Sequence, residues 1–357
     1  MSRNDKQSKN FEPELLVEVR RGPITESRHR GHVIVVDGDG SEIARLGEPE
    51  TVTYLRSSAK PFQALPFITS GAADHLGFSA KELAVACGSH SGEPIHTETV
   101  AAMLQRIGLE ASVLKCGTHE PFSREAARRL REQGQSPNLL HNNCSGKHTA
   151  MVALALHLGA PIASYDQPDN PVQLMIARMV EQFSGVPVGK IVLGIDGCGV
   201  PVFGISVRAM ALMYARLVTP PADFDDKKRG ACQQVVAAML DYPEMIGGTT
   251  ERLDTEVMRA APKRLVSKVG AEGVYTAGIL PCEQWPRGLG IAIKIEDGDD
   301  RRARPTVVIE TLRQLSILRD QELEALAPYA GFPLRNHSGT LVGNVHPCFN
   351  LQRVNKS

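Results

Sequence analysis

The apolar residues of the chain fall into short β-rich runs and longer segments with helical spacing. The short runs cover residues 14–21, 31–37, 41–46, 190–195, 200–207, 274–280 and 290–295. The turn Gly38-Asp39-Gly40 between the second and third runs predicts a β-hairpin. The polar cluster at 26–30 is expected to be a solvated loop, and the glycine-bounded segment 265–273 a turn.

Helical patterns fill the middle of the chain. Asn170-Pro171 supplies a cap and a first-turn proline to a segment whose apolar positions recur at 172, 175, 176, 179, 180 and 183. Ser79 and Glu82 have the spacing of a capping box. The apolar run 149–158 stops at Gly159, which is typical of a helix C-terminus. Further helices are predicted at 61–65, 96–107, 123–133, 228–240, 250–260 and 306–318.

Strands therefore gather at both ends of the chain, with helices between them. No internal repeat and no linker rich in proline or serine divides the sequence, so we predict one α+β domain over residues 13–357. Its C-terminal part is expected to be mostly irregular. Residues 1–12 are polar and lack the apolar core of a signal peptide, and we expect them to form a disordered tail.

Composition excludes several classes of function. At 42% hydrophobic and 22% charged residues, the 357-residue chain is typical of a soluble globular protein. Its 40 Lys and Arg are balanced by 40 Asp and Glu, which argues against nucleic-acid binding. No apolar run is long enough to span a bilayer. The seven cysteines are irregularly spaced, and without a signal peptide they indicate free thiols in a reducing cytoplasm.

The first candidate for chemistry is a serine-lysine pair, Ser57 and Lys60. A serine hydroxyl needs a base, and a lysine serves when burial keeps it neutral. The spacing alone has little specificity, because Ser112 and Lys115 repeat it. Since Lys60 precedes Pro61, the helix is expected to start at the proline and leave Ser57 in the loop before it. Ser89 is a second candidate, because it follows a helix end in a position that capping does not explain.

The second candidate is a group of soft ligands. Cys144, Lys147 and His148 lie within five positions at the head of an apolar helix, and Cys198 follows a strand in a glycine turn. Two thiolates suit a divalent metal such as zinc. His148 is a more ordinary zinc ligand than Lys147, and the sequence leaves both open. Buried structural thiols, or Cys144 acting as a catalytic thiol with His148, are the alternatives.

Seven blocks in order give the chain a clear resemblance to a known family, the asparaginase II family of the rhizobial type. The resemblance extends over nearly the whole length. The blocks are 16–22, 56–61, 86–91, 115–119, 142–148, 196–198 and 266–271.

The resemblance implies hydrolysis of L-asparagine to L-aspartate and ammonia. It also implies a fold similar to serine β-lactamases and penicillin-binding proteins, with a central antiparallel sheet flanked by helices. In such enzymes the serine-lysine pairs correspond to Ser57 with Lys60 and to Ser89 with Lys268. The resemblance further implies a homodimer and a zinc ion, with ligands that correspond to Cys144, Lys147 and Cys198.

Amide hydrolysis assigns provisional roles to these residues. Ser57 is expected to attack the side-chain carbonyl while Lys60 takes its proton, and Ser89, tuned by Lys268, to relay a proton. A zwitterionic substrate needs countercharges. Arg56 and His90 are the candidates for its carboxylate, and Glu26 or Asp196 for its ammonium.

Two other functions fit the same residues. One is a glutaminase- or β-lactamase-like enzyme acting on a different amide. The other is a zinc-dependent structural protein in which Ser57 and Lys60 are incidental.

Overall fold

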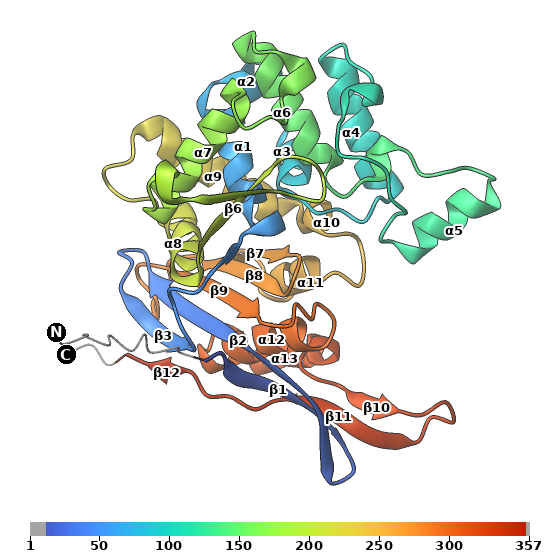
Figure 1. Ribbon diagram of the computed structural model, residues 1–357, viewed down its shortest axis with the longest axis vertical. Coiled ribbons are helices and arrows are strands. Elements are labelled where there is room, and N and C mark those ends of the chain that lie inside the picture. Colours follow the sequence, from blue (N-terminus) through green and yellow to red (C-terminus); the bar gives the residue numbers. More distant parts are fainter. Residues whose placement is uncertain (1–11, 355–357) are drawn as a thin grey trace, which may run out of the picture.

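The computed structural model describes residues 12–354, so all but the last residue of the predicted N-terminal tail lies outside it. Figure 1 shows one large sheet with a thick layer of helices over one side and a smaller helical group on the other. The α+β prediction and the predicted central antiparallel sheet are confirmed. Within the described residues, no helix is both long and apolar enough to cross a bilayer.

The large sheet joins the two ends of the chain. Its strands run in the order β10-β11-β1-β2-β9-β8-β7, with β3 pairing β2 and β12, and every pair is antiparallel. The bounds are β1 (Glu14–Arg21), β2 (Ile24–Asp37), β3 (Glu42–Leu46), β7 (Leu265–Gly270), β8 (Val274–Ile279), β9 (Leu289–Ile295), β10 (Pro333–Arg335), β11 (Leu341–Pro347) and β12 (Gln352–Arg353).

The centre of this sheet is covered on both faces. Four successive residues of β2, positions 33–36, are fully buried, which requires packing on both sides of the strand. Helix α8 (Val207–Val218) contacts β2, β8 and β9, and α12 (Ala303–Gln314) contacts β1, β8, β9 and β11. A side chain at Gly290 would lie 1.8 Å from the Ala211 carbonyl oxygen, so glycine is what lets α8 lie directly on β9.

The helical layer is built around α1, whose residues from Lys60 to Ile68 are all buried. It contacts α3, α6, α7 and α9, and Phe62 packs edge-on against Phe183 and Tyr214. The bounds in this layer are α1 (Lys60–Thr69), α2 (Ala72–His75), α3 (Ala80–Cys87), α4 (Pro94–Arg106), α5 (Arg124–Glu132), α6 (Ser145–Leu158), α7 (Pro171–Ser184), α9 (Asp226–Asp241), α10 (Pro243–Ile246) and α11 (Leu253–Ala260). The short α13 (Asp320–Ala325) follows α12 in the chain and is labelled near it in Figure 1.

A second, three-stranded sheet leads the chain into α1. It has the order β4-β6-β5, with β4 (Val52–Tyr54), β5 (Val192–Ile195) and β6 (Pro201–Ser206). The 3-10 turn η1 (Arg56–Ala59) follows β4 and contacts β7, the edge strand of the large sheet. The block around Ser57 is thereby placed next to the block around Lys268.

The helix caps were predicted well and the polar strands were not. Ser79 and Glu82 form both bonds of the capping box, Asn170 caps α7, and Gly159 ends α6 with φ of 64°. The predicted loop at 26–30 is instead part of β2, where exposed positions alternate with less exposed ones. The predicted turn at 265–273 is mostly β7, and much of the C-terminal part forms strands that pair with β1 and β3.

Candidate active site

Lys60 is the residue around which the candidate site is arranged. It opens α1 one residue before the predicted start at Pro61, because its backbone is helical (φ −58°, ψ −41°) despite the proline that follows, and only 1% of it is exposed. Its Nζ lies 2.7 Å from the Gly88 carbonyl oxygen, 2.9 Å from Ser89 Oγ and 3.1 Å from the Asn143 carbonyl oxygen. Two carbonyls and one hydroxyl can satisfy either the three N–H donors of an ammonium or the two N–H donors and one lone pair of a neutral amine. Burial lowers the pKa of Lys60 and so favours that neutral form.

Ser89 is held rigidly on the other side of this contact. Its backbone N–H donates to the Ile246 carbonyl at 2.8 Å, and its own carbonyl accepts from Arg252 at 2.8 Å. A side chain at Gly88 would come within 2.3 Å of the Met245 carbonyl oxygen, so the turn after α3 needs glycine there. The Ser89 hydroxyl is thus fixed at hydrogen-bond distance from a buried amine.

The serine-lysine pairing in the structure differs from the predicted one. Ser57 lies in η1 and is partly exposed, and it is not among the three hydrogen-bond partners of Lys60. The amine of Lys60 reaches the loop after α3 instead of turning back along its own helix. The candidate base and the candidate nucleophile Ser57 are therefore neighbours in sequence without a hydrogen bond between them.

Lys268 has a different partner as well. It is fully buried on β7, and its Nζ donates to Asp254 Oδ2 at 3.2 Å and to the Val269 carbonyl oxygen at 3.1 Å, not to Ser89. Burial lowers the pKa of Lys268 to about 8, although the Asp254 carboxylate opposes the shift. Sequence reasoning missed Asp254. The only signal was an acidic residue in the first turn of a predicted helix, which the helix dipole explains without any role in a site.

Arg56 and Asp196, two predicted substrate-binding residues, come together. Arg56 Nε donates to Asp196 Oδ1 at 2.8 Å. Burial alone would raise the pKa of the Asp196 carboxyl, but Lys147 and Arg56 outweigh it and lower that pKa, so Asp196 is ionised at neutral pH. Arg56 has φ of 50°, a left-handed conformation that costs a non-glycine residue energy and is concentrated at functional sites.

The predicted metal ligands also converge. Cys144 and Cys198 are each 5% exposed, and Lys147 Nζ lies 3.0 Å from Cys198 Sγ. A hydrogen bond from Cys198 holds the pKa of the Cys144 thiol well below its usual range. Burial would lower the pKa of Lys147, but the two thiols outweigh it and raise that pKa. Lys147 is thus an ammonium here and must lose a proton before it can bind a metal.

His148, the alternative ligand, is already in the form that a metal needs. Burial lowers its pKa to about 4, so its imidazole is neutral at pH 7. Its Nδ1 lies 2.6 Å from the Tyr165 hydroxyl, while its Nε2 is buried and has no hydrogen-bond partner among the described residues. Across residues 12–354, no group of three or more His, Cys, Asp or Glu side chains is arranged to hold a metal. The donors that do meet are two thiols with an amine and an imidazole close by.

Two predicted substrate-binding residues do not fit their roles in this structure. His90 is fully buried, its Nδ1 accepts from the Gly92 N–H and its Nε2 bonds Ser145, so no ring nitrogen is free. Burial lowers its pKa far below the usual range, which leaves no positive charge for a carboxylate. Glu26 is exposed and pairs with Arg21 on the β1–β2 hairpin, which projects away from the helical layer (Figure 1).

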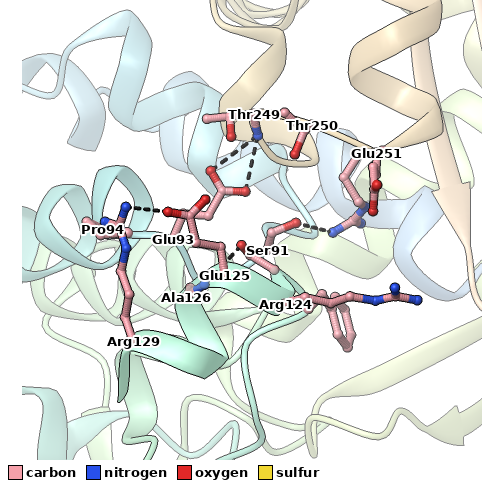
Figure 2. A pocket seen from close by; sticks show the side chains of 13 residues that line it. Ser91, Glu93, Pro94, Arg124, Glu125, Ala126, Arg129, Thr249, Thr250 and Glu251 are labelled. Atoms are coloured by element: carbon pink, nitrogen blue, oxygen red, sulfur yellow. Dashed lines mark hydrogen bonds and ion pairs between the residues drawn. The ribbon is translucent and has the colours of Figure 1, made fainter. Parts of the chain in front are cut away.

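A polar cavity of about 460 Å³ opens beside the Ser89 loop. Figure 2 shows Ser91 and Glu93 on one wall and the 249–251 segment on the other, with the Thr249 N–H donating to the Glu93 carboxylate. Arg252 lines the same cavity and donates to Ser91 Oγ at 2.8 Å. Arg252 thus connects this cavity to the loop that carries Ser89.

Solved structures that resemble the chain include a probable glutaminase and a β-lactamase. A structure described as a probable glutaminase from Bacillus subtilis complexed with 6-diazo-5-oxo-L-norleucine is 14% identical, covers 81% of this chain and 85% of its own, and has a TM-score of 0.38. A β-lactamase from Burkholderia vietnamiensis is 13% identical, with coverages of 85% and 92% and a TM-score of 0.36.

Among curated proteins, no sequence match was found. The profile of the L-asparaginase II family, in contrast, matches residues 17–347, which include every block that carries the candidate site. The match extends from β1 to the end of β11 and so takes in both ends of the central sheet. The chain therefore belongs to the L-asparaginase II family.

Proposed function

We propose that this protein is an L-asparagine amidohydrolase that uses a serine nucleophile and a lysine base. Family membership supports an amidohydrolase. The observation that carries the mechanism is the buried Lys60 amine, placed 2.9 Å from the Ser89 hydroxyl with its other two contacts on carbonyl oxygens, one helical turn from Ser57 in the chain. Burial lowers the pKa of Lys60 and so favours a neutral amine, whose lone pair can accept a proton from a serine hydroxyl.

The reaction follows from that proton transfer. The serine oxygen attacks the carboxamide carbon of asparagine as its proton passes to Lys60. The C–N bond breaks, and the departing ammonia takes the proton from the Lys60 ammonium. Water then attacks the resulting ester, again giving a proton to Lys60, and aspartate leaves as the proton returns to the serine oxygen. We keep Ser57 as the proposed nucleophile, and Ser89 is the second candidate because it alone is hydrogen-bonded to Lys60.

The charges of the substrate have partners in the same neighbourhood. The α-carboxylate of asparagine would pair with Arg56 and its α-ammonium with Asp196. Arg56 and Asp196 already form an ion pair at 2.8 Å. When asparagine binds, this one ion pair would be replaced by two, one between Arg56 and the α-carboxylate and one between Asp196 and the α-ammonium. Such an exchange leaves no unpaired charge in a partly buried site.

A substrate panel tests the proposed function. The purified protein is offered L-asparagine, L-glutamine and a chromogenic cephalosporin, and release of ammonia or chromophore is followed. We expect the highest kcat/KM with asparagine. Preferential turnover of glutamine or the cephalosporin would show that the substrate is another amide. If none of the three compounds is turned over, the remaining hypothesis is that the protein is a zinc-dependent structural protein.

We further propose that Cys144 and Cys198 hold a zinc ion, with Lys147 as the third ligand and His148 as the alternative. The convergence of two buried thiols with an unpartnered imidazole nitrogen supports this. When bound, zinc would act as a Lewis acid near the Arg56–Asp196 pair. These residues themselves would orient the substrate.

Replacing both Cys144 and Cys198 with serine is expected to remove the bound zinc, because serine hydroxyls are poor ligands for this metal. Elemental analysis of the purified variant and the parent measures the loss. Cys232→Ser, which changes a buried thiol on α9 outside this group, is the control and should leave the zinc content unchanged. Equal zinc in the double variant and the parent would reject the site. The single variants Lys147→Met and His148→Phe then show which side chain is the third ligand.

We also propose a homodimer that forms through β5. This strand lies at the edge of the small sheet and exposes Leu193 by 51% and Ile195 by 82%. Exposed apolar edge strands pair readily with another chain. Ile195→Lys is expected to convert a dimer into a monomer of 38.7 kDa in sedimentation equilibrium. A parent protein that already sediments as a monomer would contradict the proposal.

A further inference from the structure

Asp254 is a buried carboxylate whose hydrogen bonds all go to one segment of β7. Only 1% of the residue is exposed. Its Oδ1 accepts from Ser267 Oγ at 2.9 Å and from the Val269 N–H at 2.9 Å, and its Oδ2 accepts from Lys268 Nζ at 3.2 Å. Three successive residues of the edge strand are therefore tied to one side chain at the start of α11.

The same short segment also supports the Ser89 loop. Arg252, two residues before Asp254, donates to the Ser89 carbonyl at 2.8 Å and to Ser91 Oγ at 2.8 Å. One turn of chain thus holds both the strand that carries Lys268 and the loop that carries Ser89. A change in either contact would alter the positions of the two candidate catalytic groups together.

We infer that Asp254 is a positioning residue that keeps Lys268 as a fixed ammonium beside the Lys60–Ser89 contact, so that Lys268 supplies a positive charge and does not act as the base for Ser89. This inference rests on the proposed function for its catalytic consequence. The geometric part does not depend on the proposed function: the Asp254 carboxylate binds Lys268 and stabilises its ammonium form.

The charges around Lys268 favour this assignment. The Asp254 carboxylate stabilises its ammonium form, as does the Val269 carbonyl that accepts a second N–H, and the groups that face the Lys268–Asp254 pair from neighbouring elements are cationic or neutral. These are Lys60 from α1, Cys87 from α3, Tyr214 from α8, Arg252 ahead of α11 and Tyr275 from β8. Without Asp254, burial and the Arg252 guanidinium would disfavour a charged Lys268, and Lys60 would add to this effect whenever it is protonated.

Lys268 also has the geometry of a donor. An ammonium has three N–H groups. Two of them are used by Asp254 and by the Val269 carbonyl, which leaves one that can point to the developing negative charge of a tetrahedral intermediate. A base for Ser89 would instead need a lone pair directed at that hydroxyl, and the amine hydrogen-bonded to Ser89 belongs to Lys60.

The activity test uses Lys268→Arg, Lys268→Met and Asp254→Asn. Arginine stays charged at all accessible pH values, so Lys268→Arg should keep a measurable part of kcat for asparagine and lose the fall in activity near pH 8. Lys268→Met should lose activity at all pH values. If Lys268 were a base, the arginine variant would be as inactive as the methionine variant, and that result would overturn the inference.

Asp254→Asn keeps the size of the side chain and an acceptor for the Val269 N–H but removes the charge. Because the carboxylate raises the pKa of Lys268, its loss should move the alkaline fall in kcat to lower pH, with activity at pH 8 reduced about tenfold for each unit moved. The matched control is Ser267→Ala, which removes another hydrogen bond to Asp254 but leaves the charge. It should keep the pH profile of the parent. An unchanged profile in Asp254→Asn would leave Asp254 a purely structural residue and overturn the inference.

A second readout does not depend on activity. The folded-state pKa of Lys268, about 8, lies below the unfolded value of about 10.4, so the folded state binds fewer protons between these values. Its contribution to the free energy of unfolding therefore rises with pH in this window and is flat below it. In Asp254→Asn the lower edge of the window should move below pH 8. Denaturant titrations between pH 6 and 8 measure this change in the free energy of unfolding. The references are the parent protein and the double variant Lys268→Met/Asp254→Asn.

The two readouts separate the possible failures. A new rise in stability between pH 6 and 8 in Asp254→Asn, absent from the double variant, supports the Asp254–Lys268 coupling whether or not asparagine is a substrate. No such rise overturns the coupling itself. If the parent hydrolyses no amide while the rise is present, the proposed function fails and the charge assignment of Lys268 stands.

Discussion

Replacing Ser57 with alanine is expected to abolish ammonia release from L-asparagine while leaving the fold intact. Without a nucleophilic hydroxyl no acyl-enzyme forms, and losses of about 10³-fold or more in kcat are usual for such changes. Ser57 is partly exposed in a single 3-10 turn, so the loss of its hydroxyl removes little packing. The assay compares kcat and the melting temperature of the variant with those of the parent.

The chain contains its own control for this experiment. Ser112 stands three positions before Lys115, as Ser57 does before Lys60, but it is exposed on a surface turn. Ser112→Ala should therefore retain full activity. If Ser57→Ala keeps wild-type turnover and Ser89→Ala loses it, the nucleophile is Ser89, which the hydrogen bond from Lys60 already makes the second candidate. Mass spectrometry of a trapped acyl-enzyme peptide distinguishes the two serines directly.

The sequence was informative wherever local chemistry determines structure. The strand at 14–21 and the caps at Ser79, Asn170 and Gly159 depend on neighbours within a few residues, and all were predicted correctly. The polar cluster around Glu26 was interpreted as a loop, but it pairs with the adjacent strand β1 and is itself a strand. Its side chains are mostly polar and exposed, so the segment lacks the apolar alternation by which a half-buried strand is predicted.

The same limit applies to the site. The blocks contain Lys60, Ser89 and Lys268 but not Asp254, and in the structure these residues form two buried contacts, Lys60–Ser89 and Lys268–Asp254, that are close enough for Lys60 to affect the pKa of Lys268. Which amine contacts which hydroxyl depends on where α3 ends and how α11 approaches β7, and neither follows from spacing along the chain. His90 illustrates the reverse case, since a histidine between two serines suggested a substrate contact while tertiary burial used both of its ring nitrogens.

Replacing Lys60 with methionine is expected to have an effect on activity as large as the loss of the nucleophile. Methionine fills a similar volume but cannot accept the serine proton or return it to ammonia, so kcat should fall by about 10³-fold or more. Lys115→Met, which removes an amine paired with Asp166 at the surface, is the matched control and should keep parental activity. Wild-type turnover in Lys60→Met would exclude Lys60 as the base for either serine.

The effect of Lys60→Met on stability has two opposing parts. The Gly88 and Asn143 carbonyls lose their donor, which costs about 1–3 kcal/mol for each group left buried and unpaired. Against this, the folded state no longer has to bury an amine whose charged form it disfavours. The pKa of Lys60 is lower in the folded state than in the unfolded state. The contribution of Lys60 to the free energy of unfolding is therefore least favourable at low pH, and it improves as the pH rises from the folded-state pKa to the unfolded-state pKa. The methionine variant should therefore be most stable relative to the parent at low pH, and unfolding free energies measured across this range would reveal a buried amine even if activity were lost for another reason.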